Sequence, residues 1–322
     1  MRAVRVEDGA LEVGEIDAPD LVAGGLRVRV AAAGVNRADL MQRRGFYPPP
    51  PGASEVLGLE CAGEVLEVGD GVAGWKPGDR VMALLAGGGY AEEVVVDAGS
   101  ALPVPATFSF AEAAVFPEVF LTVFSNVWQI AGLEARQTLL VHGGGSGIGT
   151  ASIQLATEAG IPVYVTAGSQ EKCARCLSLG ASLAIDYREQ DFAEEVARAT
   201  DGRGVDVILD SIGGAYLASN LRSLSVGGKL ILIGLMQGAK AEINLGALLS
   251  RRLQVVGSTL RAKSLEEKAA IVSGLVDTFG GAIEAGRLRP VLHEVFPLEA
   301  ADDAHALMQA SGHFGKIALA LD

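Results

Sequence analysis

Residues 138–157 read TLLVHGGGSGIGTASIQLAT, and the rest of the chain is organised around this stretch. The apolar run 139–141 predicts a buried strand, and five glycines follow it within residues 143–149. The small and apolar residues after the glycines predict a helix packed closely on a sheet. Glycines let a pyrophosphate approach backbone amides, and a helix N-terminus adds partial positive charge. The stretch therefore predicts a dinucleotide-binding turn, with a purely structural turn as the alternative.

The spacing of the glycines narrows the kind of nucleotide site. The strict G-x-G-x-x-G pattern is not met, because Ser146 stands where the spacing from Gly144 requires glycine. The residues that remain for a phosphate are Gly144, Gly147 and Gly149. No Lys-Ser or Lys-Thr pair follows, so the sequence disfavours the P-loop of nucleoside triphosphatases.

The composition fits a soluble enzyme of about two domains. The chain has 322 residues, and 49% of them are apolar, which is enough for a substantial core. Its 39 acidic against 26 basic residues give a net charge of −13, which disfavours nucleic acid or an anionic membrane as a general partner. The first residues contain no apolar leader and the three cysteines suit a reducing compartment, so we expect a cytoplasmic protein.

Two segments invite other interpretations. Residues 111–133 form a long apolar segment, but Glu112, Pro117 and Glu118 interrupt it, so we expect a helical stretch over 110–131 and not a membrane span.

Cys173 and Cys176 have metal-ligand spacing, but no second pair completes four ligands. We interpret them as ordinary thiols.

The order of the expected elements predicts how the domains are connected. Residues 1–110 contain short alternating runs between Gly, Pro and Asp turns, which is typical of a β-rich domain. After the glycines, we expect strands at 163–166, 183–186, 205–210, 229–234 and 253–257, and helices at 170–179, 191–199 and 214–224. This alternation predicts a doubly wound parallel sheet. A helix at 265–285, a short helix at 298–309 and strands at 292–296 and 315–321 follow, and we place the two strands in the first domain. The expected domains are thus residues 1–113 with 259–322, and residues 114–258.

In such a sheet, ligands bind beyond the carboxyl ends of the strands. The candidates there are His142, residues 167–169, Tyr187, residues 211–213 including Ser211, and residues 234–235. We expect His142 to pack in the core more readily than to contact a cofactor.

Residues 166–172, about 20 positions after the glycines, bear on the choice of nicotinamide cofactor. They read TAGSQEK and place no acid at the strand end, where an NAD site uses one for the ribose hydroxyls. Ser169 and Lys172 can donate to a 2′-phosphate at the helix start, although Lys172 also fits a solvated helix position. We therefore expect NADPH in preference to NADH.

Several motifs occur in an order that resembles one known family. They are NRADLMQR at 36–43, YPPPPGAS at 47–54, LGLE at 57–60, GWKPGDRV at 74–81, the turn at 144–149, TAGSQ at 166–170 and GKI at 315–317. Together they resemble the zinc-free NADPH quinone oxidoreductases, the zeta-crystallin-like branch of the medium-chain dehydrogenase/reductase superfamily. The resemblance covers nearly the whole chain. It implies a Rossmann domain inserted into a GroES-like β-rich catalytic domain, with the active site in the cleft between them.

The resemblance also implies roles for individual residues. Contacts to the pyrophosphate would come from Gly144, Ser146, Gly147 and Ile148, and contacts to the 2′-phosphate end from Gly168, Ser169, Lys172 and Tyr187. Lys316 would add a further cation, Leu235 and Leu260 would flank the nicotinamide, and Asn36, Tyr47 and Thr122 would line the substrate side.

The same comparison of motifs predicts a metal-free reaction. Zinc-dependent relatives have a cysteine in the segment that is 36–39 here and a histidine at the position of Leu59, so three zinc ligands cannot be assembled. Without a Lewis acid an alkoxide is hard to form, which disfavours alcohol oxidation. Electron-poor acceptors such as quinones need no metal. The proton-donor candidate is Tyr47, because a phenol can protonate an enolate or hydroquinone oxygen.

Three functions remain open from the sequence. NADPH-dependent quinone reduction leads, an enone or alkenal double-bond reductase is the alternative enzyme, and a non-catalytic NADPH-binding protein is the alternative of another class. We expect a small-molecule substrate and a homodimer or homotetramer, in which the apolar segment 253–257 pairs as an edge strand across a dimer axis.

Overall fold

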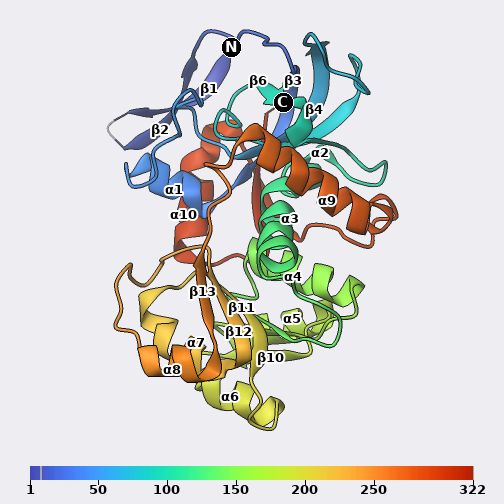
Figure 1. The fold of residues 1–322 in the computed structure, drawn as a ribbon. Helices are drawn as coiled ribbons and strands as arrows, with labels where there is room; N and C mark the ends of the chain where they lie inside the picture. The colour runs from blue at the N-terminus through green and yellow to red at the C-terminus, as the bar shows by residue number, and fades with distance from the viewer. Residues whose placement is uncertain (8, 322) are drawn as a thin grey trace. The chain divides into compact units, whose positions relative to one another are not determined.

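The computed structural model describes residues 1–7 and 9–321 and divides the chain into two compact units (Figure 1). Unit 1 comprises Met1–Leu121 and Leu260–Asp322, and unit 2 comprises Thr122–Thr259. Helix α2 (Phe110–Ala113) packs on strands β3 and β4 of unit 1. The Glu118 amide donates to Glu60 Oε2 of the same unit, so the first boundary lies later than the expected residue 113. Each unit has its own sheet.

Every residue of unit 2 is described, and six strands form one parallel sheet in the order β10-β9-β8-β11-β12-β13. They are β8 (Leu139–His142), β9 (Val163–Ala167), β10 (Leu183–Asp186), β11 (Val205–Asp210), β12 (Leu224–Leu232) and β13 (Gln254–Gly257). The chain moves from β8 outward to β10 and then returns to β11 on the other side of β8. This change of direction is the topological switch point of a Rossmann fold, and it confirms the expected fold class.

Helices cover both faces of this sheet (Figure 1). Helices α4 (Gly147–Glu158) and α5 (Gln170–Leu179) pack on β8, β9 and β10. An apolar cluster includes residues of α6 (Phe192–Ala199) and α7 (Leu217–Ser223), with Leu248 of α8 (Leu245–Arg251) packed against it. No sequence pattern indicated helix α8. Strand β12 begins at Leu224, earlier than the expected residue 229, because Gly227 and Gly228 interrupt its apolar pattern.

Within the described residues of unit 1, seven strands form a second sheet, in the order β14-β15-β3-β4-β5-β7 with β6 paired to β3. The strands are β3 (Gly25–Val35), β4 (Glu60–Val68), β5 (Arg80–Leu84), β6 (Glu93–Asp97), β7 (Ala101–Pro103), β14 (Leu292–Pro297) and β15 (Lys316–Ala320). A separate hairpin pairs β1 (Arg2–Glu7) with β2 (Ala10–Glu15). β15 pairs with β3 in antiparallel fashion, so the last strands do return to the first sheet, as expected.

Four further helices belong wholly or partly to unit 1. They are α1 (Arg37–Arg43), α3 (Pro117–Val123), α9 (Leu265–Glu284) and α10 (Ala301–Ala310). Helix α10 packs on β15 and on α1, and it adds Ala304 and Met308 to the main apolar cluster of the unit.

The apolar segment 110–130 is long and apolar enough to cross a membrane by length and composition, with a mean hydropathy of 1.3. However, 78% of that window is buried inside the protein, as in the core helix of a folded domain. The segment also does not form one regular helix, because α3 starts anew at Pro117 and a π-helical stretch, Phe124–Ile130, follows it.

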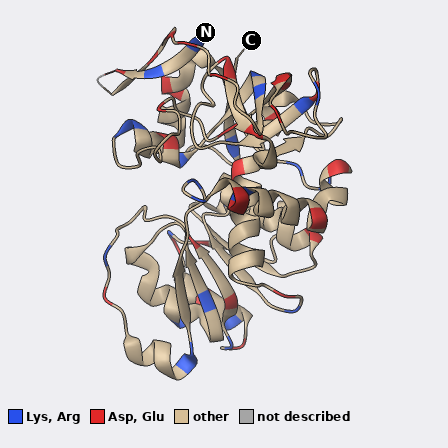
Figure 2. Ribbon diagram, turned by 45° about the horizontal axis from the view of Figure 1, so that its top comes forward, with Lys and Arg blue, Asp and Glu red and all other residues tan. Residues whose placement is uncertain are grey.

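Acidic and basic residues are dispersed along the ribbon of both units in Figure 2. Many of them form exposed ion pairs with each other, such as Arg198 with Glu195 and Arg203 with Asp206. The acidic residues that give the net charge of −13 thus occur in both units.

Candidate functional site

The glycine turn of unit 2 ends at the N-terminus of α4. Ser146 is the N-cap residue, and its Oγ accepts a hydrogen bond from the Gly149 amide at 3.0 Å while donating to the Gly143 carbonyl at 2.7 Å. The amides of Gly147 and Ile148 are the first two of the helix, so they have no carbonyl partner within it. Ser146 thus closes the turn, and the next two amides can face an anion.

The glycines at 144 and 149 are required by packing. A Cβ on Gly144 would lie 2.7 Å from the Val165 side chain and 3.0 Å from Cys176 Sγ. A Cβ on Gly149 would overlap the Gly143 carbonyl and lie 2.5 Å from Gly144 Cα. These two glycines therefore let the turn and the start of α4 pack closely on β9 and α5, which is one of the tasks of glycine in a dinucleotide-binding turn.

Of the four residues predicted for the 2′-phosphate end, Gly168, Ser169 and Lys172 follow β9, and Tyr187 follows the neighbouring strand β10. Ser169 caps α5, and its Oγ accepts a hydrogen bond from the Lys172 amide at 3.2 Å, so its hydroxyl proton remains for another acceptor. A Cβ on Gly168 would lie 2.6 Å from Tyr187 Oη, which places the phenol against this backbone.

The Lys172 ammonium lies in a basic environment. Burial lowers its pKa, and the positive charges of Arg175 and Arg188 lower it further, while Glu171 acts in the opposite direction. No motif indicated these two arginines, because Arg175 lies in the next turn of α5 and Arg188 follows β10. An anion bound here would relieve the repulsion among the three cations.

The loops after β11 and β12 run side by side at the same edge of the sheet. Ser211 O accepts a hydrogen bond from the Met236 amide at 3.1 Å, and Ile212 O accepts one from Gln237 at 2.7 Å. Leu235 is 54% exposed and packs beside Gly213. Ser211 and Leu235 therefore lie at the carboxyl ends of neighbouring strands, as expected.

His142 is part of a buried network at this edge. Its Nε2 lies 2.7 Å from Asn220 Oδ1 and its Nδ1 lies 3.1 Å from Thr166 Oγ1. Asn220 donates in turn to Asp210 Oδ2 at 3.0 Å, and the Asp210 carboxylate also accepts the Ile212 and Gly213 amides. Burial lowers the pKa of His142 to about 4, so the ring is neutral. The network fixes the ends of β8, β9 and β11 around the glycine turn.

In unit 1, Asn36 and Lys316 are joined by Glu60. The Lys316 ammonium lies 2.8 Å from Glu60 Oε1 and donates to the Val35 carbonyl at 3.0 Å and to Asn36 Oδ1. Asn36 Nδ2 donates to Glu60 Oε1 at 2.9 Å, and the Glu118 amide donates to Glu60 Oε2 at 2.9 Å. The side chains of Lys316 and Glu60 are 3% and 0% exposed.

This network corrects the roles that the resemblance implied for two residues. The Lys316 ammonium is enclosed by a carboxylate and two carbonyl oxygens, so it is a structural cation and not an open contact for a phosphate. Both polar ends of the Asn36 side chain are also engaged inside unit 1, and the residue is 6% exposed. Asn36 therefore supports the site from within and has little surface to line it.

A second buried cluster lies next to Asn36. Asp39 is fully buried, and its carboxylate accepts hydrogen bonds from the Asn36 and Gly58 amides and from Tyr90 Oη. Burial raises the pKa of Asp39 to about 6 despite these donors. Tyr90 Oη also lies 3.2 Å from His305 Nε2. The cluster connects α1 to α10 and holds the start of the segment that leads to Tyr47.

Tyr47 is half-buried and lies against Arg261. The Arg261 guanidinium is 5.2 Å from the centroid of the Tyr47 ring, and its Nη1 donates to the Tyr47 carbonyl at 3.1 Å. Burial raises the pKa of the Tyr47 phenol, the positive charge of Arg261 lowers it, and Glu118 raises it slightly. No sequence motif indicated Arg261, which is more than 200 positions away from its partner in the chain.

The two remaining predicted site residues are those at which the chain passes from one unit to the other in sequence. Thr122 lies in α3, is 7% exposed and is the first residue of unit 2. Leu260 is half-buried and begins the returning part of unit 1. Their predicted contacts with substrate and nicotinamide stay predictions.

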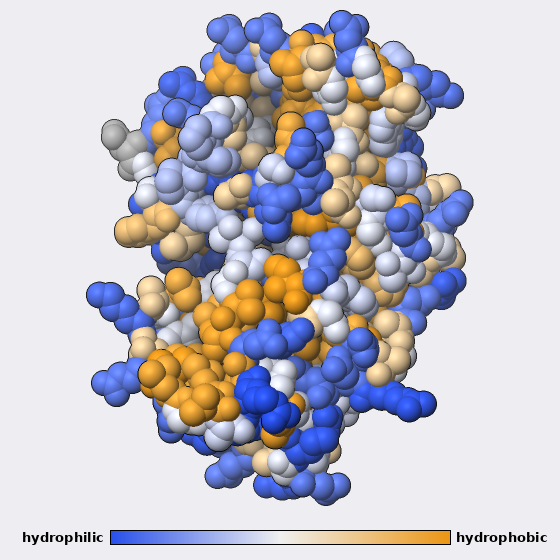
Figure 3. Space-filling view, viewed as in Figure 1, coloured by the Kyte–Doolittle hydropathy of each residue, from blue (hydrophilic) through white to orange (hydrophobic). Residues whose placement is uncertain are grey.

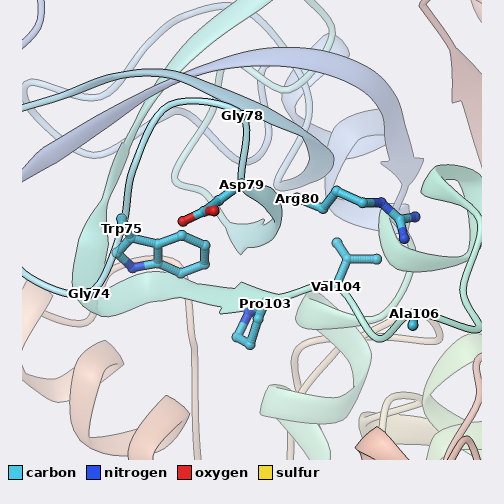
Figure 4. Close-up of a pocket in the computed structure, with 8 residues that line it drawn as sticks. All are labelled: Gly74, Trp75, Gly78, Asp79, Arg80, Pro103, Val104 and Ala106. Carbon is cyan, nitrogen blue, oxygen red and sulfur yellow. The ribbon is translucent and has the colours of Figure 1, made fainter.

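A surface groove of about 640 Å³ in unit 1 is a different feature (Figure 4). Trp75, Asp79 and Pro103 lie along it, with Val104, Ala106 and the stem of Arg80 at one end. Among the described residues that line it, none was predicted for the cofactor or substrate. Within residues 1–7 and 9–321, no group of three or more His, Cys, Asp or Glu side chains is arranged to hold a metal ion.

Two family models match the chain. Residues 22–106 match the alcohol dehydrogenase GroES-like domain, and residues 147–273 match the zinc-binding dehydrogenase family. The quinone oxidoreductase of Rattus norvegicus is 31% identical over 100% of this chain and 98% of its own length.

Two solved structures match this fold over its whole length. An NAD-dependent alcohol dehydrogenase is 32% identical with a TM-score of 0.88, and the match covers 100% of both chains. The CurK enoyl reductase is 27% identical with a TM-score of 0.86, and the match covers 100% of this chain and 99% of that one. The chain therefore belongs to the medium-chain dehydrogenase/reductase superfamily, with quinone oxidoreductases among its full-length relatives, and is an oxidoreductase that uses a nicotinamide cofactor on small-molecule substrates.

Proposed function

We propose that the protein is a zinc-independent, NADPH-dependent reductase of quinones. The observation that carries the cofactor choice is the arrangement after β9, where Ser169, Lys172 and Tyr187 gather around Gly168 and the strand ends without an acid. A carboxylate there would bind ribose hydroxyls and repel a 2′-phosphate, whereas these donors and the cations nearby attract it.

The residues of unit 2 fit a dinucleotide. Gly144 and Gly149 leave no space for a Cβ, and the amides of Gly147 and Ile148 begin α4, so a pyrophosphate can lie against the turn. Ser211 and Leu235 lie at the same edge of the sheet and would contact the nicotinamide half. The bound cofactor would supply a hydride, or its electrons singly, to an electron-poor acceptor.

The chain's own residues position the reactants and provide a proton. The full-length relative from rat is a quinone oxidoreductase, which supports a quinone as the acceptor. A reduced quinone gains negative charge on oxygen, and the Tyr47 phenol is the candidate that donates a proton to it. Neither role requires a metal, in agreement with Leu59 at the position where zinc-dependent relatives have histidine.

Two measurements on the purified protein test this proposal. Fluorescence titration with NADPH and NADH should give much tighter binding of NADPH, and equal affinities would overturn the cofactor assignment. Oxidation of NADPH should proceed with a naphthoquinone, without stoichiometric zinc in the protein and without inhibition by a chelator. Loss of activity on chelation, with recovery on adding zinc, would overturn the metal-free mechanism.

An enone or alkenal reductase is the second candidate. The similarity to the CurK enoyl reductase supports it, since that protein shares the fold over the full length. Faster NADPH oxidation with an enal than with a naphthoquinone would favour this candidate. The absence of turnover with every acceptor of both classes, with NADPH binding intact, would favour a non-catalytic NADPH-binding protein.

We also propose that two copies of the chain associate through unit 2. Strand β13 is an edge of the sheet, and Figure 3 shows apolar side chains gathered over β13 and α8. Leu245 is 67% exposed, Leu249 83% and Val255 37%. A second copy related by a two-fold axis would pair both β13 edges and bury both apolar surfaces at once.

Light scattering tests the association, and it distinguishes a homodimer from a homotetramer. The native protein should have at least twice the mass of one chain, and Leu249→Glu should shift it to the monomer. A native protein that is monomeric would overturn the proposal.

For the whole protein we propose a cytoplasmic location, which fractionation of cells that express it would test.

A further inference from the structure

Arg261 is the polar centre of the loops around Tyr47. It is 5% exposed, and its three types of nitrogen donate to three places in unit 1. Nε donates to the Ala86 carbonyl at 2.8 Å, Nη1 to the Tyr47 carbonyl at 3.1 Å, and Nη2 to Gln42 Oε1 at 2.7 Å. A buried guanidinium with these contacts is fixed in place, because any rotation would break at least one of them.

These contacts hold the loop that carries Tyr47. Gln42 Nε2 donates to the Glu55 carbonyl at 2.8 Å, so Gln42 joins the two ends of the loop while its Oε1 binds Arg261. Four prolines at 48–51 stiffen the chain directly after Tyr47. The position of the phenol therefore depends on Arg261 at one side and on the proline segment at the other.

The guanidinium also acts on the phenol through its charge. It lies 5.2 Å from the ring centroid, at a distance where a cation interacts with an aromatic face. The charged groups that act on Tyr47 are Arg261 and, more weakly, Glu118. The groups that act on Arg261 include Asp39 and Lys268, whose ammonium donates to the Arg261 carbonyl at 3.0 Å. Arg261 is thus the cation that favours the phenolate, against the effect of burial.

We propose that Arg261 is the positioning residue for Tyr47: it fixes the place of the phenol and eases the release of its proton to the reduced substrate. The inference rests on the proposed function, in which Tyr47 donates a proton to a quinone or enolate oxygen. Arg261 acts through Tyr47, since each of its three nitrogens donates to a protein oxygen and the residue is 5% exposed.

The first test needs no substrate and is therefore independent of the proposed function. A ring-fluorinated tyrosine at position 47 gives a fluorine NMR signal that reports the titration of this phenol alone. In Arg261→Met the midpoint should move to higher pH by about 1–3 units, because the cation that favours the phenolate is lost. In Arg261→Lys, which keeps the charge, the midpoint should move by less.

The matched control is Arg37→Met. Arg37 is a half-buried arginine of unit 1 whose Nη2 donates to the Met308 carbonyl and to Ser311 Oγ at the end of α10. This variant should leave the midpoint unchanged. An unchanged midpoint in folded Arg261→Lys and Arg261→Met, or an equal shift in Arg37→Met, would overturn the inference.

The second test is kinetic. Arg261→Met should lower kcat about tenfold or more with a small change in KM, and the alkaline limb of the pH profile should move to higher pH. In a Tyr47→Phe background the same substitution should have little further effect. Multiplicative losses in the double variant would show that Arg261 acts independently of Tyr47 and would overturn the inference. If no acceptor is reduced at all, the proposed function fails, while the NMR titration still decides the coupling.

Discussion

The buried ion pair between Lys316 and Glu60 gives a sharp prediction about the stability of unit 1. In Lys316→Met, the methionine fills much of the same volume, but the Glu60 carboxylate loses its cation inside the core. The ammonium and carboxylate are 2.8 Å apart, and their side chains are 3% and 0% exposed. Water therefore cannot replace the lost partner.

The magnitude follows from what remains around the carboxylate. Glu60 keeps the Asn36 Nδ2 and Glu118 amide donors, at 2.9 Å each, and breaking a buried pair on one side costs about 3–5 kcal/mol. In the double variant Glu60→Gln with Lys316→Met, both charges are absent, and the loss should be only about 1–3 kcal/mol for the altered hydrogen bonds. The double variant should thus be more stable than Lys316→Met alone.

Urea denaturation can follow unit 1 by itself. The chain has two tryptophans, of which Trp75 lies in unit 1 and Trp128 in unit 2. In a Trp128→Phe background the fluorescence of Trp75 reports the unfolding of unit 1. The control is Arg29→Met, which breaks an ion pair with Glu64 in the same unit, whose side chains are 61% and 39% exposed, and should cost less than about 1 kcal/mol.

The result that would refute the reasoning is specific. If Lys316→Met and Arg29→Met destabilise unit 1 equally, burial does not set the cost of the broken pair. If the double variant is less stable than the sum of the two single variants predicts, the two charges do not compensate each other.

Three further predictions concern unit 2. Lys172→Met should weaken NADPH binding by about 10–100-fold and leave NADH within about twofold, because only the former carries the 2′-phosphate; equal losses in fluorescence titrations would contradict the assignment. Gly149→Ala should weaken both cofactors by about tenfold or more, since its Cβ would overlap the Gly143 carbonyl and displace the turn; calorimetric titration with unchanged affinities would refute this. The free energy of unfolding of the native protein should exceed that of His142→Gln by an amount that shrinks by up to about 3 kcal/mol between about pH 6.5 and 4. The reason is that the folded state keeps His142 neutral while the unfolded state binds a proton. Urea denaturation of both proteins along this pH range measures the difference, and a constant difference would exclude the histidine as the cause.

Much of the fold of unit 2 was predictable because its signals are local. Strands β10 and β11 and helix α5 have the predicted bounds, since apolar runs of strand length alternate there with capped helices. Helix α8 was missed because it is short and two of its leucines, Leu245 and Leu249, are exposed, which leaves only Leu248 against the core. A helix whose apolar residues point mostly outward does not show the periodic pattern of a core helix.

The candidate site was predictable only where its residues are close in the sequence. Ser169 and Lys172 lie within one helical turn, so a motif could identify them. By contrast, the pair Lys316 and Glu60 and the contact between Arg261 and Tyr47 join residues more than 200 positions apart. The fold of unit 1 brings these partners together. The resemblance implied that Lys316 contacts the cofactor, whereas the structure places its ammonium against the Glu60 carboxylate.

The pairing of β15 with β3 has a consequence for synthesis of the chain. Unit 2 is one continuous segment, Thr122–Thr259, so all its strands have been made while the end of unit 1 is still missing. The sheet of unit 1 instead needs Lys316–Ala320 to fill the place between β3 and β14. On the ribosome the inserted unit can therefore complete its core first, and the older N-terminal strands must wait with an open edge. Residues 25–35 therefore present an unpaired strand edge until residues 316–320 have been made.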